Sequence, residues 1–199
     1  MALTPSSMLP LGTPLPTGLL HEELEGGSLQ QVSGEPLQLE TLEGLGGKPL
    51  LVLFICAHCP YVKHIEPEIS RLAADVAAQL QILAISSNST TTHPQDGPEG
   101  LRDQAERLGW RFPYLLDQSQ AVARAFEAAC TPDPYLFGWD AGQGRHTLAY
   151  RGQLDGSRPG NSVPLDGSDI RAALQAVLAG RQPTAEQIPS IGCNIKWHP

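Results

Sequence analysis

The sequence predicts an α/β fold in which helices cover both faces of a mixed central sheet, a three-layer sandwich. Two observations indicate this architecture. Short apolar runs alternate with amphipathic segments from residue 50 to about residue 129, which is the pattern of strand–helix–strand units. A strand–turn–strand pattern and a last amphipathic segment follow at residues 135–151 and 170–180. With 199 residues, the chain is long enough to bury a sizeable core.

The first predicted strand is the unbroken apolar run Leu50–Cys56, which is typical of a strand buried on both faces. Pro60 stands where a helix takes its first residue, the position at which proline costs least. Apolar residues then recur at helical spacing as far as Leu80. The later elements follow in order: a strand at 82–85, a helix around 101–108, a strand at 112–116, a helix around 122–129, a hairpin of strands at 135–139 and 146–151, and a helix at 170–178 that ends at Gly180.

The two ends of the chain lack this alternation of apolar and amphipathic segments. Residues 1–35 are rich in proline and glycine and only weakly periodic, so we expect an N-terminal arm laid on the domain. We expect the main domain to span residues 36–182. Residues 183–199 then form a C-terminal tail packed on that domain.

Composition excludes several classes of partner. Acidic residues outnumber basic ones by 21 to 13, and no run of Lys or Arg occurs, so we expect no nucleic-acid partner. No apolar stretch approaches the roughly 18 residues of a membrane span, and the N-terminus lacks a signal-peptide pattern. We therefore expect a cytoplasmic protein without a membrane partner. In a reducing compartment, cysteines are more often catalytic or metal-binding than structural.

Two of the four cysteines form a Cys-x-x-Cys pair, Cys56-Ala57-His58-Cys59, at the junction between the first predicted strand and the helix that follows it. A helix N-terminus favours a thiolate, and His58 adds a possible cation. Such surroundings lower the pKa of a thiol from about 8.5 into roughly the 3.5–7.5 range, so we expect Cys56 to be the reactive thiolate. Cys59 would then be the shielded thiol that resolves the mixed disulfide.

Other uses of the pair fit less well. A zinc site usually needs a second close pair of ligands, whereas Cys130 and Cys193 stand alone. Covalent haem needs a histidine directly after the second cysteine, where this chain has Pro60. We therefore expect no metal and no organic cofactor.

The Cys56–Pro60 stretch and the Thr131-Pro132 step resemble those of the thioredoxin fold. More narrowly, the chain resembles the peroxiredoxin-like proteins of the thioredoxin superfamily, which are related to alkyl hydroperoxide reductase and the thiol-specific antioxidant proteins. The segments that carry this resemblance are residues 59–63, 130–133, 150–159 and 189–197, and it covers about residues 36–199.

The resemblance implies a thioredoxin-like sandwich in which Pro132 is a cis-proline packed against the redox pair. It also implies that Thr131 offers backbone hydrogen bonds to an incoming peptide. We therefore take His58, Thr131 and Pro132 as candidate substrate-binding residues.

Two departures from the family patterns bear on the reaction. Thioredoxin itself has Gly-Pro between its cysteines, where this chain has Ala57-His58, so the reductase and oxidase directions both stay open. Peroxiredoxins carry a threonine where this chain has Leu53, which argues against peroxide reduction. We predict a thiol–disulfide oxidoreductase whose partner is a thiol or disulfide protein or a small disulfide. The alternatives are a thiol peroxidase in which Cys56 is oxidised by peroxide, and a redox-sensing protein without turnover.

Topology predicts further neighbours of the pair, because sites in open α/β sheets form at the carboxyl ends of parallel strands. The loop after Ile85, with Asn88, His93 and Asp96, leaves the sheet at the same edge as Cys56. The later hairpin returns Asp155 and Arg158 to this edge. These two residues either shape the pocket or form a surface turn with a weak ion pair.

The remaining cysteines are auxiliary candidates. Cys130 precedes the Thr-Pro step, where a third redox thiol and a small buried hydrophobe are both possible, and packing is favoured. Cys193 lies in the tail, which could extend ~40 Å at ~3.3 Å per residue. That length lets Cys193 reach either Cys56 or a partner subunit.

Overall fold

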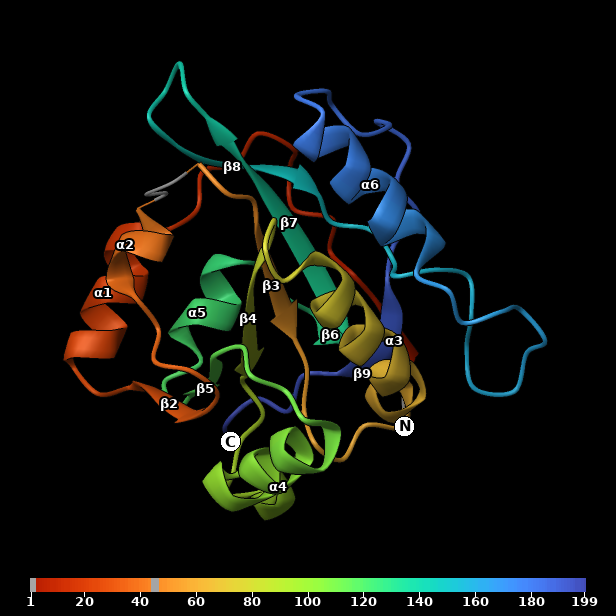
Figure 1. The fold of residues 1–199 in the computed structure, drawn as a ribbon. Coiled ribbons are helices and arrows are strands. Elements are labelled where there is room, and N and C mark those ends of the chain that lie inside the picture. Colours follow the sequence, from red (N-terminus) through yellow and green to blue (C-terminus); the bar gives the residue numbers. More distant parts are fainter. Residues whose placement is uncertain (1–2, 44–46) are drawn as a thin grey trace.

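The protein is described by a computed structural model covering residues 3–43 and 47–199. A six-stranded sheet forms its centre (Figure 1). β3 pairs in parallel with β4 and antiparallel with β7, so the sheet is mixed, as predicted. The strands in spatial order are β2 (Leu29–Ser33), β5 (Tyr114–Asp117), β4 (Gln81–Ser86), β3 (Leu50–Phe54), β7 (Asp133–Asp140) and β8 (Arg145–Tyr150).

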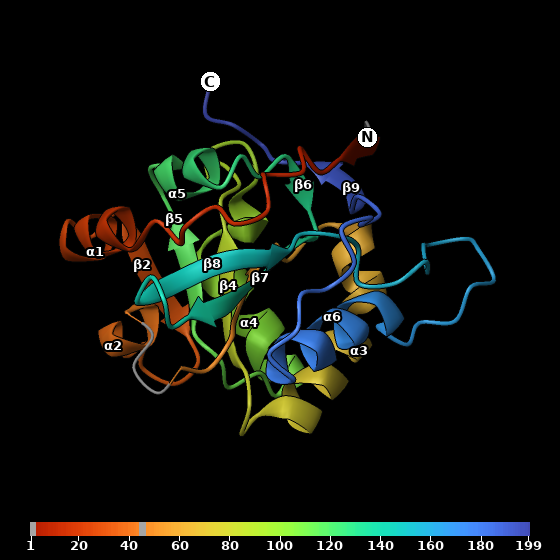
Figure 2. The same ribbon diagram turned by 90° about the horizontal axis from the view of Figure 1, so that it is seen from above.

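Helices cover both faces of this sheet, which confirms the three-layer sandwich (Figure 2). One face carries α3 (Pro60–Val76) and α6 (Ser168–Leu178), with α4 (Pro98–Leu108) contributing to the same core. The other face carries α1 (Thr17–Glu25), α2 (Leu39–Leu42) and α5 (Ala121–Ala125). Within the described ranges, no helix has both the length and the apolarity needed to cross a bilayer.

β3 lies in the middle of both cores. All five of its residues are buried, and their side chains alternate between the two faces. Leu51 and Leu53 pack into the core under α3 and α6, whereas Val52 and Phe54 pack into the core under α1 and α5. The unbroken apolar run in the sequence is therefore explained by burial on both sides.

Helix α3 begins at Pro60, as the sequence predicts. It is amphipathic, and its apolar residues Val62, Ile65 and Ile69 are buried against the sheet. The helix ends at Val76 and runs without interruption through Pro67.

A second, three-stranded sheet joins the two ends of the chain to the segment just before β7 (Figure 2). Its strands are β1 (Leu3–Pro5), β9 (Ile191–Asn194) and β6 (Cys130–Thr131), with β9 in the centre. In antiparallel register, Cys193 lies opposite both Leu3 and Thr131. The C-terminal segment is therefore built into the fold beside the Thr-Pro step.

Residues 1–35 differ from the expected arm. They contain helix α1 and strand β2, and β2 forms the edge of the central sheet by antiparallel pairing with β5. Leu29 and Val32 are the buried residues of β2, while Gln30 and Gln31 lie between them. This short, mostly polar edge strand has no clear period in the sequence. It is a strand only because it pairs with β5 in the tertiary structure.

Phe126 is the centre of an aromatic cluster beneath α5. Its ring packs edge to face against Phe54, Tyr135 and Phe137, with centroids 5.2, 5.4 and 5.9 Å away. We predict that Phe126→Ala lowers the free energy of unfolding by about 3–5 kcal/mol, measured by urea titration. The control is Leu178→Ala, since Leu178 is 41% exposed and its loss should change stability by less than about 0.5 kcal/mol. An effect of Phe126→Ala no larger than the control would contradict this view of the core.

Candidate active site at the carboxyl end of the central strand

The Cys-x-x-Cys pair lies at the carboxyl end of β3. One residue, Ile55, separates Cys56 from the end of the strand, and Cys59 is the N-cap of α3. The N–H of Ile55 still donates to the Ile85 carbonyl, so the pairing of β3 with β4 continues up to the first cysteine. Both cysteines are 0% exposed. The pair therefore sits where the sequence predicts, but in an enclosed environment.

The Thr131–Pro132 peptide bond is cis, as the family resemblance implies. The Thr131 hydroxyl lies 3.6 Å from Cys56 Sγ, and the Thr131 carbonyl oxygen lies 3.3 Å from Cys59 Sγ. This proximity follows from the sheet, because β7 begins at Asp133 and pairs Asp133 with Phe54. Thr131 thus contacts both sulfurs from β6, just before the strand that pairs with β3 begins.

Asp96 anchors the turn between the two cysteines. Its Oδ1 accepts the backbone N–H groups of Ala57 (3.0 Å) and His58 (3.1 Å). Its Oδ2 contacts His58 Nδ1 at 2.5 Å and accepts from Asn88 Nδ2 at 2.8 Å. Burial alone would raise the pKa of this fully buried carboxyl, but the hydrogen bonds from His58 and Asn88 lower it. Asp96 is therefore a buried carboxylate beside the thiols.

The sequence-based placement of Asn88, His93 and Asp96 at this edge holds. His58, the proposed substrate-binding residue, is held by Asp96 and stacks on His93 with ring centroids 5.0 Å apart. Its Nδ1 is 3.8 Å from Cys56 Sγ, and its side chain is 17% exposed. The His58 ring thus lies against Cys56 and is itself partly exposed.

Cys193 lies directly against the pair. Antiparallel pairing of β9 with β6 sets Cys193 opposite Thr131, and its Sγ is 2.8 Å from Cys59 Sγ. Cys193 is also buried, with 2% exposure. Sequence reasoning allowed the tail to reach the pair, but the contact is to Cys59 and comes from a β-pairing that no local pattern reveals.

Cys56, Cys59 and Cys193 influence one another's pKa values. The neighbouring Cys56 thiol lowers the pKa of Cys59 to about 5 against the cost of burial, with smaller contributions from Cys193 and from the nearby backbone N–H of Val62. The hydrogen bond to Cys59, burial and the charge of Asp96 raise the pKa of Cys56 well above its usual range. Burial and the hydrogen bond to Cys59 raise the pKa of Cys193 to about 12.

The direction of these pKa shifts differs from the expectation of a Cys56 thiolate. The sequence argument assigned the helix N-terminus to Cys56, whereas Cys59 is the N-cap residue of α3. Cys56 instead lies beside the negative charge of Asp96.

Sequence reasoning missed a buried polar cluster that contacts the backbone of Cys56. Gln104 Nε2 donates to the Cys56 carbonyl at 3.3 Å and to Glu66 Oε1 at 2.9 Å, and the Tyr114 hydroxyl donates to Gln104 Oε1. Arg107 pairs with both oxygens of Glu66 at 3.0 Å. The sequence did carry a signal for this cluster: Gln104 and Glu66 lie on the same helix faces as the buried apolar residues, and buried polar side chains need hydrogen-bond partners.

Asp155 and Arg158 lie on the rim of the site. Together with Tyr61 and Pro132 they line a small hollow next to the cis-proline. Asp155 accepts three backbone N–H groups of its own loop, and Arg158 donates to Gln153 and to two carbonyls of that loop. The return to this edge is as predicted, and the two side chains make these loop contacts instead of the surface ion pair that was the alternative interpretation.

Cys130 lies in β6, with its Sγ 3.6 Å from the Pro132 carbonyl oxygen. It is fully buried, and burial followed by the nearby Asp133 raises the pKa of its thiol far above the usual value. These contacts favour the packing role for Cys130.

The zinc alternative has some geometric support. Donor atoms of Cys56, His58 and Asp96 lie within 4.8 Å of one another. Both Asp96 oxygens, however, already accept hydrogen bonds from protein groups. The arrangement is therefore better matched to holding the Cys56–His58 turn than to holding a cation.

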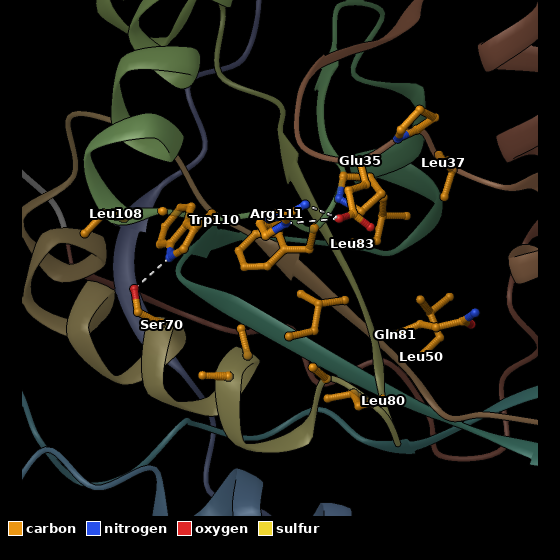
Figure 3. A pocket seen from close by; sticks show the side chains of 18 of the residues that line it. Glu35, Leu37, Leu50, Ser70, Leu80, Gln81, Leu83, Leu108, Trp110 and Arg111 are labelled. Atoms are coloured by element: carbon orange, nitrogen blue, oxygen red, sulfur yellow. Dashed lines mark hydrogen bonds and ion pairs between the residues drawn. The ribbon is translucent and has the colours of Figure 1, made fainter.

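A cavity of about 530 Å³ lies at the opposite end of β3 and β4 (Figure 3). Its lining is mostly apolar, and at one side Trp110 Nε1 donates to Ser70 Oγ while Arg111 pairs with Glu35. None of the predicted site residues lines it. The thiol chemistry therefore takes place outside this cavity.

Asp96 provides a test of the electrostatics. We predict that Asp96→Asn lowers the apparent pKa of Cys56, because the variant removes a negative charge that raises it. The measurement is the pH dependence of Cys56 alkylation by iodoacetamide in a Cys59→Ser background, where the titration belongs to one thiol. Asp103→Asn, at an exposed position on α4, is the matched control. An unchanged or higher Cys56 pKa in Asp96→Asn would contradict the prediction.

Solved structures give close matches in fold. An uncharacterized conserved protein from Geobacillus kaustophilus is 42% identical, with a TM-score of 0.85 and coverage of 100% of this chain and 98% of that chain. A thioredoxin-like protein in the oxidized form has 21% identity, a TM-score of 0.59 and coverage of 87% and 100%. A thiol-disulfide isomerase from Corynebacterium glutamicum has 19% identity, a TM-score of 0.55 and coverage of 75% and 91%. At these identities, the last two matches bear on the fold alone.

No curated protein matches the chain in sequence. The model of the AhpC/TSA family matches residues 22–153, which is more than half of the 199 residues. This match begins inside α1, so it includes β2 as well as the segment with the cysteine pair. The chain therefore belongs to the AhpC/TSA family.

Proposed function

We propose that this protein is a thiol–disulfide oxidoreductase that works through the Cys56/Cys59 dithiol. The observation that carries the proposal is the enclosure of both sulfurs at a strand–helix junction, in contact with Thr131 of the cis Thr131–Pro132 step. Membership of the AhpC/TSA family supports thiol-based redox chemistry. The neighbours described as a thioredoxin-like protein and a thiol-disulfide isomerase are in line with the same class of reaction.

Cys56 is the attacking thiol in this proposal. Cys59 is covered by Cys193 and Thr131, whereas the contacts of Cys56 include His58, whose side chain is partly exposed. A substrate that displaces the His58 ring reaches Cys56 first. Cys59 then acts as the base for the attack, because its thiolate accepts the Cys56 thiol proton.

The reaction balances in two steps. Cys56 Sγ attacks one sulfur of the substrate disulfide, the substrate S–S bond breaks, and the Cys56 proton passes through Cys59 to the leaving sulfur. Cys59 Sγ, again a thiolate, attacks Cys56 Sγ, forms the Cys56–Cys59 disulfide and releases the second substrate sulfur, which takes a proton from solvent. Two electrons move from the protein to the substrate. A second dithiol returns them, and the same steps in reverse describe oxidation of a partner.

Peroxide reduction is the second candidate, because the family match favours it. In that case Cys56 attacks a peroxide, its sulfur becomes a sulfenic acid and the alcohol or water leaves. Cys59 attacks the sulfenic acid, and the Cys56–Cys59 disulfide forms with release of water. Leu53, in place of a threonine, argues against this reading.

Two variants test the dithiol mechanism. We predict that Cys56→Ser reduces turnover of oxidised glutathione, with dithiothreitol as electron donor, to the uncatalysed rate. Cys59→Ser should instead accumulate a mixed disulfide with glutathione on Cys56, because the resolving thiol is missing. Peptide mass spectrometry detects that adduct, and Cys130→Ser, which changes a packing cysteine, is the control.

Wild-type turnover in Cys56→Ser would overturn the assignment of Cys56. A sulfenic acid at Cys56 with rapid peroxide consumption and no disulfide turnover would favour the peroxidase. Reversible oxidation without turnover of either substrate would favour redox sensing.

A further inference from the structure

Cys59 has a second sulfur within bonding reach. Its Sγ lies 2.8 Å from Cys193 Sγ, about 0.8 Å more than the S–S bond of about 2.05 Å. Cys56 is the other sulfur that interacts with Cys59, and it is the largest cause of the lowered pKa of Cys59. The central thiol of the group is thus Cys59, and it can bond to either neighbour.

The tail strand is built to hold this contact. Cys193 and Thr131 are register partners in the antiparallel pairing of β9 and β6. Gly192 permits the close approach, because a Cβ at this position would lie 2.0 Å from the Thr131 carbonyl oxygen. Beyond the strand, Asn88, Ser89 and Gln120 all hydrogen-bond to the backbone of Lys196. The tail is therefore anchored on both sides of Cys193.

We propose that Cys193 is a third redox thiol that accepts the disulfide from the Cys56–Cys59 pair, so that the stored disulfide is Cys59–Cys193. This inference rests on the proposed function, which generates the Cys56–Cys59 bond, and adds a step after it. Cys193 Sγ attacks Cys59 Sγ, the Cys59–Cys193 bond forms and the Cys56–Cys59 bond breaks. The proton from Cys193 goes to the departing Cys56 sulfur, and the oxidation state of the protein does not change.

The local electrostatics favour this step only after oxidation. In the reduced protein, the Cys59 thiolate helps to raise the pKa of Cys193, both by accepting its hydrogen bond and by its charge. Both influences disappear once Cys59 is part of a disulfide, while the nearby Lys196 continues to favour the Cys193 thiolate. Burial, the largest cause of the raised pKa of Cys193, remains, so oxidation of Cys59 removes only the part that its thiolate contributes.

The consequence is a free Cys56 thiol in a protein that still holds two oxidising equivalents. The stored bond lies between two buried residues, behind β9. Cys56 is then available for a second thiol–disulfide exchange, whereas a two-cysteine protein would have no free thiol in its oxidised state.

Disulfide mapping of the full chain tests this. The reduced protein is oxidised with one equivalent of oxidised glutathione or, separately, of diamide, then acid-quenched, alkylated and digested with trypsin. Cys56 and Cys59 share one tryptic peptide because no Lys or Arg separates them, whereas Cys193 lies in the peptide 182–196. A Cys59–Cys193 bond therefore joins two peptides, and a Cys56–Cys59 bond does not.

We expect the cross-link between these two peptides to become the main disulfide at equilibrium, with Cys56 alkylated. Cys193→Ser should lose the cross-link and retain only Cys56–Cys59, and Cys130→Ser should behave as wild type. Gly192→Ala should reduce the cross-link with all four thiols still present, because its Cβ displaces β9. Gly18→Ala is the matched control, since a Cβ at Gly18 meets nothing within 4 Å.

Absence of the cross-link from oxidised wild-type protein would overturn the proposal. Oxidation of Cys56→Ser would then show the reason: a Cys59–Cys193 bond in this variant means that the Cys56–Cys59 disulfide is the more stable of the two, and no bond means that the geometry prevents it. The two proposals fail separately. If oxidised glutathione produces no disulfide but diamide produces the Cys59–Cys193 bond, the proposed function fails and the Cys193 site stands. If glutathione is turned over and only Cys56–Cys59 forms, the function stands and the role of Cys193 fails.

Discussion

Antiparallel pairing between β3 and β7 sets Phe54 opposite Asp133, and the rest of the site depends on this register. It places the turn that follows β3 beside the cis Thr131–Pro132 step that precedes β7. Parallel pairing of β3 with β4 brings the loop that contains Asp96 to the same edge. A shift by one residue would turn the buried side chains of β3 to the opposite faces, so the two cores that fix the register also fix the site.

Burial of negative charge is the second constraint. Asp96 is ionised only because protein donors surround both of its oxygens, and the Cys59 thiolate likewise depends on thiol donors and the helix N-terminus. A further thiolate at Cys56 is opposed by Asp96 and by Cys59. The site thus holds one thiolate at a time, which suits an exchange in which each attack returns a negative charge to the next sulfur.

The tail strand changes how a substrate can approach. The family resemblance assigns the backbone of Thr131 to an incoming peptide, but β9 already pairs with that backbone. A protein substrate that used this edge would have to displace β9. A small disulfide, by contrast, would not need the edge that β9 occupies.

Local patterns were sufficient for much of this protein. The apolar run of β3, Pro60 at the start of α3 and the spacing of Cys56 and Cys59 each have one natural reading, because they depend on contacts along a single element. The edge shared by Cys56 and Asp96 also followed from strand order. Strand β2 did not, since its short polar sequence becomes a strand only by pairing with β5.

Sequence alone placed a dithiol at a strand–helix junction, and the family resemblance set a Thr-Pro step beside it. Tertiary structure decided which thiol holds the charge and which sulfur Cys193 meets. The physical reason is that the pKa of Cys59 depends on donors from Cys56, Val62 and Cys193, and Cys193 is 134 residues away along the chain. Interactions over that separation exist only after the sheet and the tail strand have formed, so no window of sequence contains them.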